Sequence, residues 1–281
     1  MESTELILGE KHLAGCLALS ASANWNQNEA DWRLMLDFGH GWSITLADGT
    51  LVASTLVLPY GERFAWVAMV LVLPEHRRKG YASRLLRVAL ADLNERGQTP
   101  ILDATPAGHE VYLQEGFRDT WGFKRFALAS HAEGLSSPEE VRPIAKTDWA
   151  GILQLDASAF GASREKVLRN LAARLPEAAL VAQRGGQIAG FLLGREGREA
   201  NQLGPLVARD SRTATELLES GLARVRAPLY ADIADHAPAL QSRAKQLGFE
   251  FQRPFSRMVH GAAGAPGDKS LVYCPAGPEL G

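Results

Sequence analysis

This chain of 281 residues has few cysteines, only short apolar runs and almost no net charge. Only Cys16 and Cys274 are present, so a disulfide-stapled fold and a cysteine-rich metal site are both excluded. The longest apolar run, at residues 64–73, is too short to span a bilayer, and the first residues lack the pattern of a signal peptide. These absences predict a cytoplasmic protein without a membrane partner.

The chain also has no large excess of charge of either sign. Thirty basic and 32 acidic side chains leave a formal net charge of −2, which gives no electrostatic reason to expect nucleic acid as a partner. The sequence contains no P-loop, no dinucleotide-binding glycine motif, no serine-hydrolase motif and no zinc spacing. His109 and His236 are isolated histidines, for which structural roles are expected. We therefore expect no metal, and any phosphate affinity must come from a local cluster.

Turns and apolar segments occur twice in the same order. Hairpin signals lie at Asp48-Gly49 and at Gly185-Gly186, which are 137 residues apart, and Gly-Phe pairs follow at residues 116 and 248, which are 132 residues apart. The first copy predicts strands at 42–46, 51–58, 64–73 and 100–103 and helices at 82–94 and 109–114. The second predicts strands at 179–183, 188–193, 202–207 and 229–233 and a helix at 212–223. This repetition indicates a duplicated α/β domain.

The composition of the segments between the copies predicts where they begin and end. Residues 131–138, HAEGLSSP, are polar and rich in glycine, serine and proline, as linkers are. We therefore expect an N-terminal domain at 1–130, a linker at 131–138 and a C-terminal domain at 139–262. Residues 263–281 are rich in glycine, alanine and proline, which predicts an irregular tail.

The turn VLPEHRRKGYAS, at residues 72–83, is the clearest candidate ligand site. It follows an apolar strand and opens a helix whose Leu85, Leu86, Ala89, Leu90 and Leu93 form one apolar stripe. The first N–H groups of a helix lack internal partners, so they bind anions well. Gly80 lets the backbone approach a ligand, and the turn carries three positive charges. An ordinary basic turn that caps a helix remains the alternative.

These residues also carry a resemblance. The pattern V-x-P-E-x-R-x-x-G-x-A resembles the acyl-CoA motif of the GNAT acetyltransferase superfamily, and residues 112–117, YLQEGF, match its Y-x-x-x-G-F segment. LDATPAG at 102–108 and NWNQ at 24–27 look like a tandem branch of that superfamily. The resemblance implies an α/β (α+β) fold of two tandem GNAT-like domains, each with a mixed, mostly antiparallel, splayed sheet flanked by helices.

The resemblance also implies a site in the N-terminal domain. Acetyl-CoA would lie in the opening of the sheet, and Tyr112 would act as the general acid that protonates the departing thiolate. A packing role for Tyr112 is the alternative. Thr105 stands where many members carry a CoA-contacting asparagine. The full set of expected CoA-binding residues is Val70, Leu71, Val72, Arg77, Arg78, Lys79, Gly80, Tyr81, Ala82, Ser83 and Thr105.

The acceptor side and the general base are less defined. The resemblance implies that the first helices form one wall of the acceptor pocket. This implicates Trp25, Asn26, Gln27, Asp31 and Trp32, with helix packing as the alternative role. The strand at 64–73 contains no carboxylate, so Glu62 and Asp103 are the nearest candidates for a base. A solvent chain, or an amine that arrives deprotonated, would serve equally well.

The second half lacks the corresponding chemistry. The turn at residues 208–214, ARDSRTA, has no glycine, and Ser211 is the expected helix N-cap. Ala244 stands where the first half has Tyr112. We expect a degenerate copy that covers or shapes the acceptor cleft of the first domain.

The sequence therefore predicts transfer of an acetyl group to a primary amine of a small molecule or a peptide. One alternative is an enzyme that uses a longer acyl-CoA. Another is a non-catalytic CoA-sensing or interaction module, which the degenerate half favours and Tyr112 disfavours. The sequence leaves open whether the chain forms a homo-oligomer.

Overall fold

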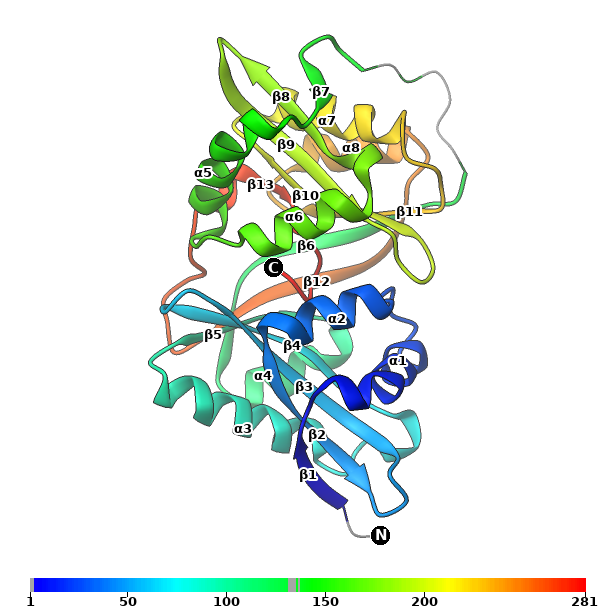
Figure 1. Cartoon of the computed structure of the whole chain (residues 1–281), viewed down its shortest axis with the longest axis vertical. Helices are drawn as coiled ribbons and strands as arrows, with labels where there is room; N and C mark the ends of the chain where they lie inside the picture. The colour runs from blue at the N-terminus through cyan, green and yellow to red at the C-terminus, as the bar shows by residue number, and fades with distance from the viewer. Residues whose placement is uncertain (1–2, 131–134, 136) are drawn as a thin grey trace. The chain divides into compact units, whose positions relative to one another are not determined.

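The structure is a computed structural model, and it describes residues 3–130, 135 and 137–281. Most of the expected linker, residues 131–134 and 136, lies outside the described residues. The chain forms two compact units (Figure 1). Unit 1 comprises Met1–Asp119 and Met258–Gly264, and unit 2 comprises Thr120–Arg257 and Ala265–Gly281.

Both halves of the chain contain the same elements in the same order, which confirms the duplicated fold. The first half runs β1 (Ser3–Ile7), α1 (Leu13–Ser22), α2 (Glu29–Phe38), β2 (His40–Leu46), β3 (Leu51–Tyr60), β4 (Phe64–Val72), α3 (Tyr81–Glu95), β5 (Thr99–Ala104), α4 (Pro106–Gln114) and β6 (Phe117–Leu128). The second runs β7 (Val141–Pro143), α5 (Trp149–Phe160), α6 (Glu165–Arg174), β8 (Leu180–Arg184), β9 (Gln187–Arg195), β10 (Asn201–Ala208), α7 (Ser211–Leu222), β11 (Leu229–Ala234), α8 (Pro238–Gln246) and β12 (Glu250–His260).

In unit 1, β1 to β4 pair antiparallel in sequence order, and β5 joins β4 in parallel. Alternate residues of a strand face opposite sides of the sheet. Val57 of β3 therefore packs in one cluster with Leu86 and Leu93 of α3, whereas its neighbour Leu58 lies against Gly39, at the end of α2. Helices α1 and α2 thus cover the face of the sheet opposite to α3, and the sheet is buried on both sides.

The last strand of each half does not stay with its own half. From Phe123 to Leu128, β6 pairs antiparallel with β11 of the second half, in unit 2. Residues Met258–Gly264, which include the end of β12, belong to unit 1. The compact units therefore differ from the boundaries that the sequence predicts, 1–130 and 139–262, because strand pairing joins segments that are far apart in the chain.

Unit 2 repeats the antiparallel order with β7 to β10, and β11 joins β10 in parallel. A buried ion pair links β6 to β11, with Arg125 donating to Asp232 at 2.8 and 2.7 Å. The tail is more ordered than the sequence predicts, because Val272–Cys274 form strand β13, which pairs with β10. The prediction that Ser211 is the N-cap is also wrong, since Asp210 caps α7 and Ser211 is the first residue of the helix.

Leu86 provides a test of the α3 interface. Its side chain is fully buried among β3, β4 and β5, so Leu86→Ala should lower the free energy of unfolding by about 2–5 kcal/mol. The matched control is Leu113→Ala on α4, whose side chain is 40% exposed and should cost far less. Urea unfolding followed by circular dichroism measures both values, and equal losses would contradict the described packing.

Candidate active site

The sheet of unit 1 opens between its two parallel strands. Strands β4 and β5 pair only from Phe64 to Trp66, opposite Thr99 to Ile101. Beyond Trp66, no other strand of unit 1 pairs with this side of β4 in the part of the chain that the structure describes. Backbone groups of Val70 and Val72 therefore line an opening in which an extended, amide-bearing ligand finds hydrogen-bond partners.

A bulge accompanies this opening. Met69 has a left-handed backbone, with φ of 53°, and the register between β3 and β4 shifts at the same point. The Ser54 hydroxyl donates a hydrogen bond of 2.7 Å to the Met69 carbonyl and so holds the bulge in place. Bulges redirect the backbone groups that follow them. The sequence gives no local signal for Met69, because an apolar residue in a strand is ordinarily extended.

The turn after β4 exposes the N-terminus of α3. Arg78 and Gly80 are both left-handed, with φ of 59° and 77°, and no side chain that the structure describes caps the helix. The N–H groups of Tyr81, Ala82 and Ser83 consequently have no acceptor among the described residues. A Cβ atom built on Gly80 would meet no atom within 4 Å, so the space before the helix is open. This geometry suits a phosphate group.

Three basic side chains surround this helix end. Arg77 Nε donates to the carbonyl of Val72 at 3.2 Å, and Lys79 Nζ lies 3.3 Å from His76 Nδ1. Within the described ranges, Arg77, Arg78 and Lys79 form no ion pair with a carboxylate. Their charge is therefore available to an anion bound at the helix N-terminus.

Tyr112 lies on α4 beside the same opening. Its half-buried ring packs against the cluster that also contains Val70, Leu102 and Phe117, and it meets Phe117 edge-on at 6.0 Å between ring centroids. Burial raises the pKa of Tyr112 well above its ordinary value, so the phenol keeps its proton at neutral pH. The hydroxyl has no hydrogen-bond partner among the described residues. It can therefore donate to a ligand atom.

Gly108 leaves the space that this ring occupies. A Cβ atom at residue 108 would lie 2.8 Å from Cε2 and 3.3 Å from the hydroxyl oxygen of Tyr112, which is too close for any side chain without movement of the ring. The sequence contains Gly108 within LDATPAG, one helical turn before Tyr112, and that spacing on a helix is the signal for the contact. Gly108 and Met69 are the residues at the site that sequence reasoning missed.

The remaining candidates near the opening differ in their surroundings. Thr105 is the N-cap position of α4, but its hydroxyl makes no capping hydrogen bond and is free to meet a ligand. Glu62 is exposed in the turn before β4, at the end of the strand opposite to the turn that leads into α3. Asp103 is half-buried on β5 beyond the residues that pair with β4.

The predicted acceptor residues divide into two groups. Asp31 and Trp32 are buried within the helical layer: Asp31 forms a capping box with Asn28 at 3.0 and 3.2 Å, and the Trp32 indole donates to Ser20 Oγ at 2.8 Å. These contacts favour the packing role for both. Trp25, Asn26 and Gln27 lie in the connection between α1 and α2, where the buried Gln27 Oε1 has no hydrogen-bond partner among the residues that the structure describes.

Comparison with known proteins identifies this arrangement. A sequence profile described as "Acetyltransferase (GNAT) family" matches residues 12–117, and one described as "Acetyltransferase (GNAT) domain" matches residues 152–274. The chain belongs to the GNAT superfamily. It carries two GNAT domains in tandem and is by homology an N-acyltransferase, in a family that uses acyl-CoA donors and amine acceptors.

Several relatives share nearly the whole tandem GNAT chain. The uncharacterized N-acetyltransferase YitH of Bacillus subtilis is 24% identical over 87% of each chain. The holothin acyltransferase of Pseudoalteromonas sp. is 26% identical over 82% of this chain and 78% of its own. A solved candidate acetyltransferase from Pyrococcus horikoshii superposes with a TM-score of 0.83 at 19% identity, covering 99% of this chain and 96% of its own. The tandem fold is thus shared across distant GNAT proteins.

The second GNAT domain lacks the features of the first. At the N-terminus of α7, the Asp210 carboxylate accepts from the Thr213 N–H at 2.8 Å and from its hydroxyl at 3.0 Å, so an acidic group already occupies the anion position. Ala244, which corresponds to Tyr112, is fully buried in the core of unit 2. Of the two units, unit 1 therefore keeps the open helix N-terminus and the tyrosine that the GNAT motifs select.

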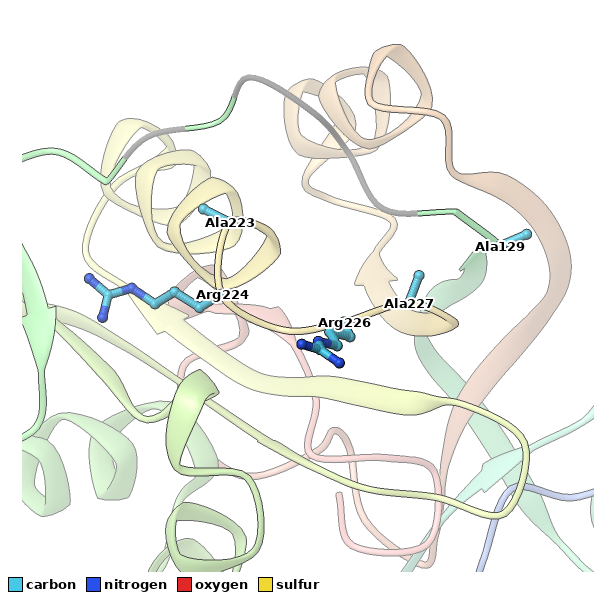
Figure 2. A pocket seen from close by; sticks show the side chains of 5 residues that line it. All are labelled: Ala129, Ala223, Arg224, Arg226 and Ala227. Carbon is cyan, nitrogen blue, oxygen red and sulfur yellow. The ribbon is translucent and has the colours of Figure 1, made fainter.

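A separate cavity in unit 2 plays no part in this site. It measures about 480 Å³ and is lined by Ala129, Ala223, Arg224, Arg226 and Ala227 (Figure 2). None of the residues that the GNAT motifs select lines it. Within the described ranges, no cluster of His, Cys, Asp or Glu side chains has the arrangement of a metal site, and no helix is long and apolar enough to cross a membrane.

Gly108 also yields a test that separates geometry from stability. Gly108→Ala should lower kcat by about tenfold or more, because the new methyl group displaces the Tyr112 ring. Alanine favours a helix interior over glycine by roughly 1 kcal/mol, so the folded state should lose little stability. Steady-state kinetics and thermal unfolding measure the two effects. Gly9→Ala is the control, because a Cβ atom built on Gly9 would meet no atom within 4 Å. Equal activity of both variants would refute the contact between residue 108 and the Tyr112 ring.

Proposed function

We propose that unit 1 binds acetyl-CoA and transfers its acetyl group to a primary amine. The uncapped N-terminus of α3 carries this proposal: it presents three N–H groups and open space at Gly80 to a diphosphate. Arg77, Arg78 and Lys79 add the positive charge that such a group requires. The donor then extends from this turn into the opening between β4 and β5.

The backbone of β4 orients the donor in this proposal. Val70 and Val72 follow the bulge at Met69 and meet the amides of the pantetheine arm, as a strand would, while Thr105 reaches it from the start of α4. A backbone N–H near Val70 also stabilises the oxyanion that forms when the thioester carbonyl is attacked. This positioning supports direct transfer without a covalent enzyme intermediate.

Tyr112 completes the reaction. The amine attacks the thioester carbonyl carbon, its nitrogen releases a proton to solvent, the C–S bond breaks, and the Tyr112 hydroxyl gives its proton to the departing thiolate. Burial raises the pKa of the phenol, which alone would weaken it as an acid. The same dry surroundings also raise the pKa of the thiol, because both anions lose hydration there, and this offsets the higher pKa of the phenol. The phenolate then recovers its proton from solvent.

The acceptor in this proposal is a small-molecule amine. The relative named holothin acyltransferase supports a small-molecule acceptor over a peptide. The residues proposed to face it are Gln27, whose buried side-chain oxygen lacks a partner in the described part of the chain, and the neighbouring Trp25 and Asn26. With β4 free of carboxylates, the amine loses its proton to solvent, or to Glu62 or Asp103, before it attacks. A cytoplasmic location agrees with the two free thiols of Cys16 and Cys274.

The donor site has a direct test. Gly80→Glu places a side chain and a negative charge where the diphosphate is proposed to lie, so calorimetric binding of acetyl-CoA should weaken at least a hundredfold. Glu75→Gln, an exposed change of charge in the same turn, is the control and should bind as the wild type does. An unaltered affinity of Gly80→Glu would refute the donor site. Titration with a longer acyl-CoA in parallel decides whether the acyl chain is limited to acetyl.

The catalytic role of Tyr112 has another. Tyr112→Phe retains the ring but loses the hydroxyl, so kcat should fall roughly 10²–10⁴-fold while the Kd for acetyl-CoA changes little. Release of free CoA thiol, followed across a panel of small amines and short peptides, measures kcat and identifies the acceptor class. A chain that binds acetyl-CoA but releases no thiol with any amine would instead support a CoA-sensing module.

A further inference from the structure

Residues 265–281 run into the sheet of unit 2. Strand β13 pairs antiparallel with β10, with Leu206 opposite Cys274 and Val207 opposite Val272, and it also contacts β11. Strands β10 and β11 pair with each other only from Asn201 to Leu203. The side chains of Val272, Tyr273 and Cys274 are buried, and Tyr273 and Cys274 lie in the core of the unit. Strand β13 thus lies in the opening that begins after Leu203 (Figure 1).

The same opening exists in unit 1 without such a strand. There the parallel pairing of β4 with β5 ends at Trp66, and a bulge in the β3–β4 register follows. In unit 2 the pairing of β10 with β11 ends at Leu203, and the β9–β10 register shifts next. Because the two halves repeat element by element, β13 occupies in unit 2 the place that the proposed function gives to pantetheine in unit 1.

Several contacts hold the segment in this place. His236 Nε2 lies 2.9 Å from the Val272 carbonyl oxygen and donates to it, and burial lowers the pKa of His236, so the ring stays neutral. Glu279 forms a fully buried ion pair with Arg195 of β9. Arg164 donates to the Gly281 carbonyl. A Cβ on Gly204 would collide with the Pro275 backbone, so Gly204 permits the close approach of the segment.

The phosphate end of unit 2 is closed separately. Asp210 accepts two hydrogen bonds from Thr213 and leaves no open anion position at the start of α7, whereas Gly80 leaves one at the start of α3. A carboxylate therefore takes the place of the diphosphate, and a strand takes the place of the pantetheine arm.

We infer that β13 is a built-in occupant of the second acyl-CoA cleft, so that unit 2 takes no acyl-CoA and the chain binds one donor molecule. The segment completes the sheet by strand addition and keeps the buried backbone of β10 hydrogen-bonded. The count of one rests on the proposed function of unit 1, whereas the occupation of the cleft by β13 does not.

Reciprocal exchange of the two cap residues tests this inference. Asp210→Gly reopens the anion position of α7 but leaves β13 in the cleft, so calorimetry with CoA should still give one site per chain, as in the wild type. Gly80→Asp gives unit 1 the cap of unit 2 and should give none. Two sites in Asp210→Gly would overturn the inference, as would CoA-dependent protection of residues 201–214 from hydrogen exchange in any of the three proteins.

Hydrogen exchange without ligand tests the occupant itself. The amides of residues 272–274 should exchange within about tenfold of those of β10 in the full-length wild-type chain, since strands that pair within a core open together. Exchange at the rate of unstructured peptide would overturn the inference. This measurement needs no CoA. A chain that binds no CoA at all would therefore refute the proposed function, while the exchange rates of residues 272–274 would still decide whether β13 occupies the cleft.

Discussion

Hydrogen bonding of buried backbone groups is the constraint on which the rest of this protein depends. A parallel strand pair that ends after three residues leaves N–H and C=O groups within a sheet, and such groups require partners. Unit 1 combines this opening with a bulge at Met69 and an uncapped helix, all at one end of β4. The proposed donor site is therefore a direct consequence of interrupted pairing, and Tyr112 lies beside the same gap.

The two halves resolve the same backbone problem differently. In unit 2 a segment of the chain supplies the missing strand, and Asp210 supplies the missing helix cap. The occupant of the opening is thus a segment of the chain in unit 2 and a ligand in the proposal for unit 1. A duplicated domain can retain its fold after it loses its chemistry, provided that another part of the chain takes the place of the ligand.

Local pattern predicts much of this fold, and long-range pairing accounts for what it misses. The helix expected at 82–94 extends over Tyr81–Glu95, because its apolar stripe and flanking glycines are local signals. The bulge at Met69, the exchanged last strands and β13 depend on distant partners, so no window of sequence contains them. At the site, the turn and Tyr112 follow from motifs, whereas the inward position of Asp31 was readable only from its capping-box spacing with Asn28.

The exchange of final strands makes each half of the chain depend on the other for a complete fold. Excision of residues 1–130 as a separate protein would remove Met258–Gly264 from unit 1 and leave the β11-pairing edge of β6 without its neighbour. Neither half of the chain therefore contains all the segments of one compact unit. Contacts between segments that are far apart in the sequence must therefore form before either compact unit is complete.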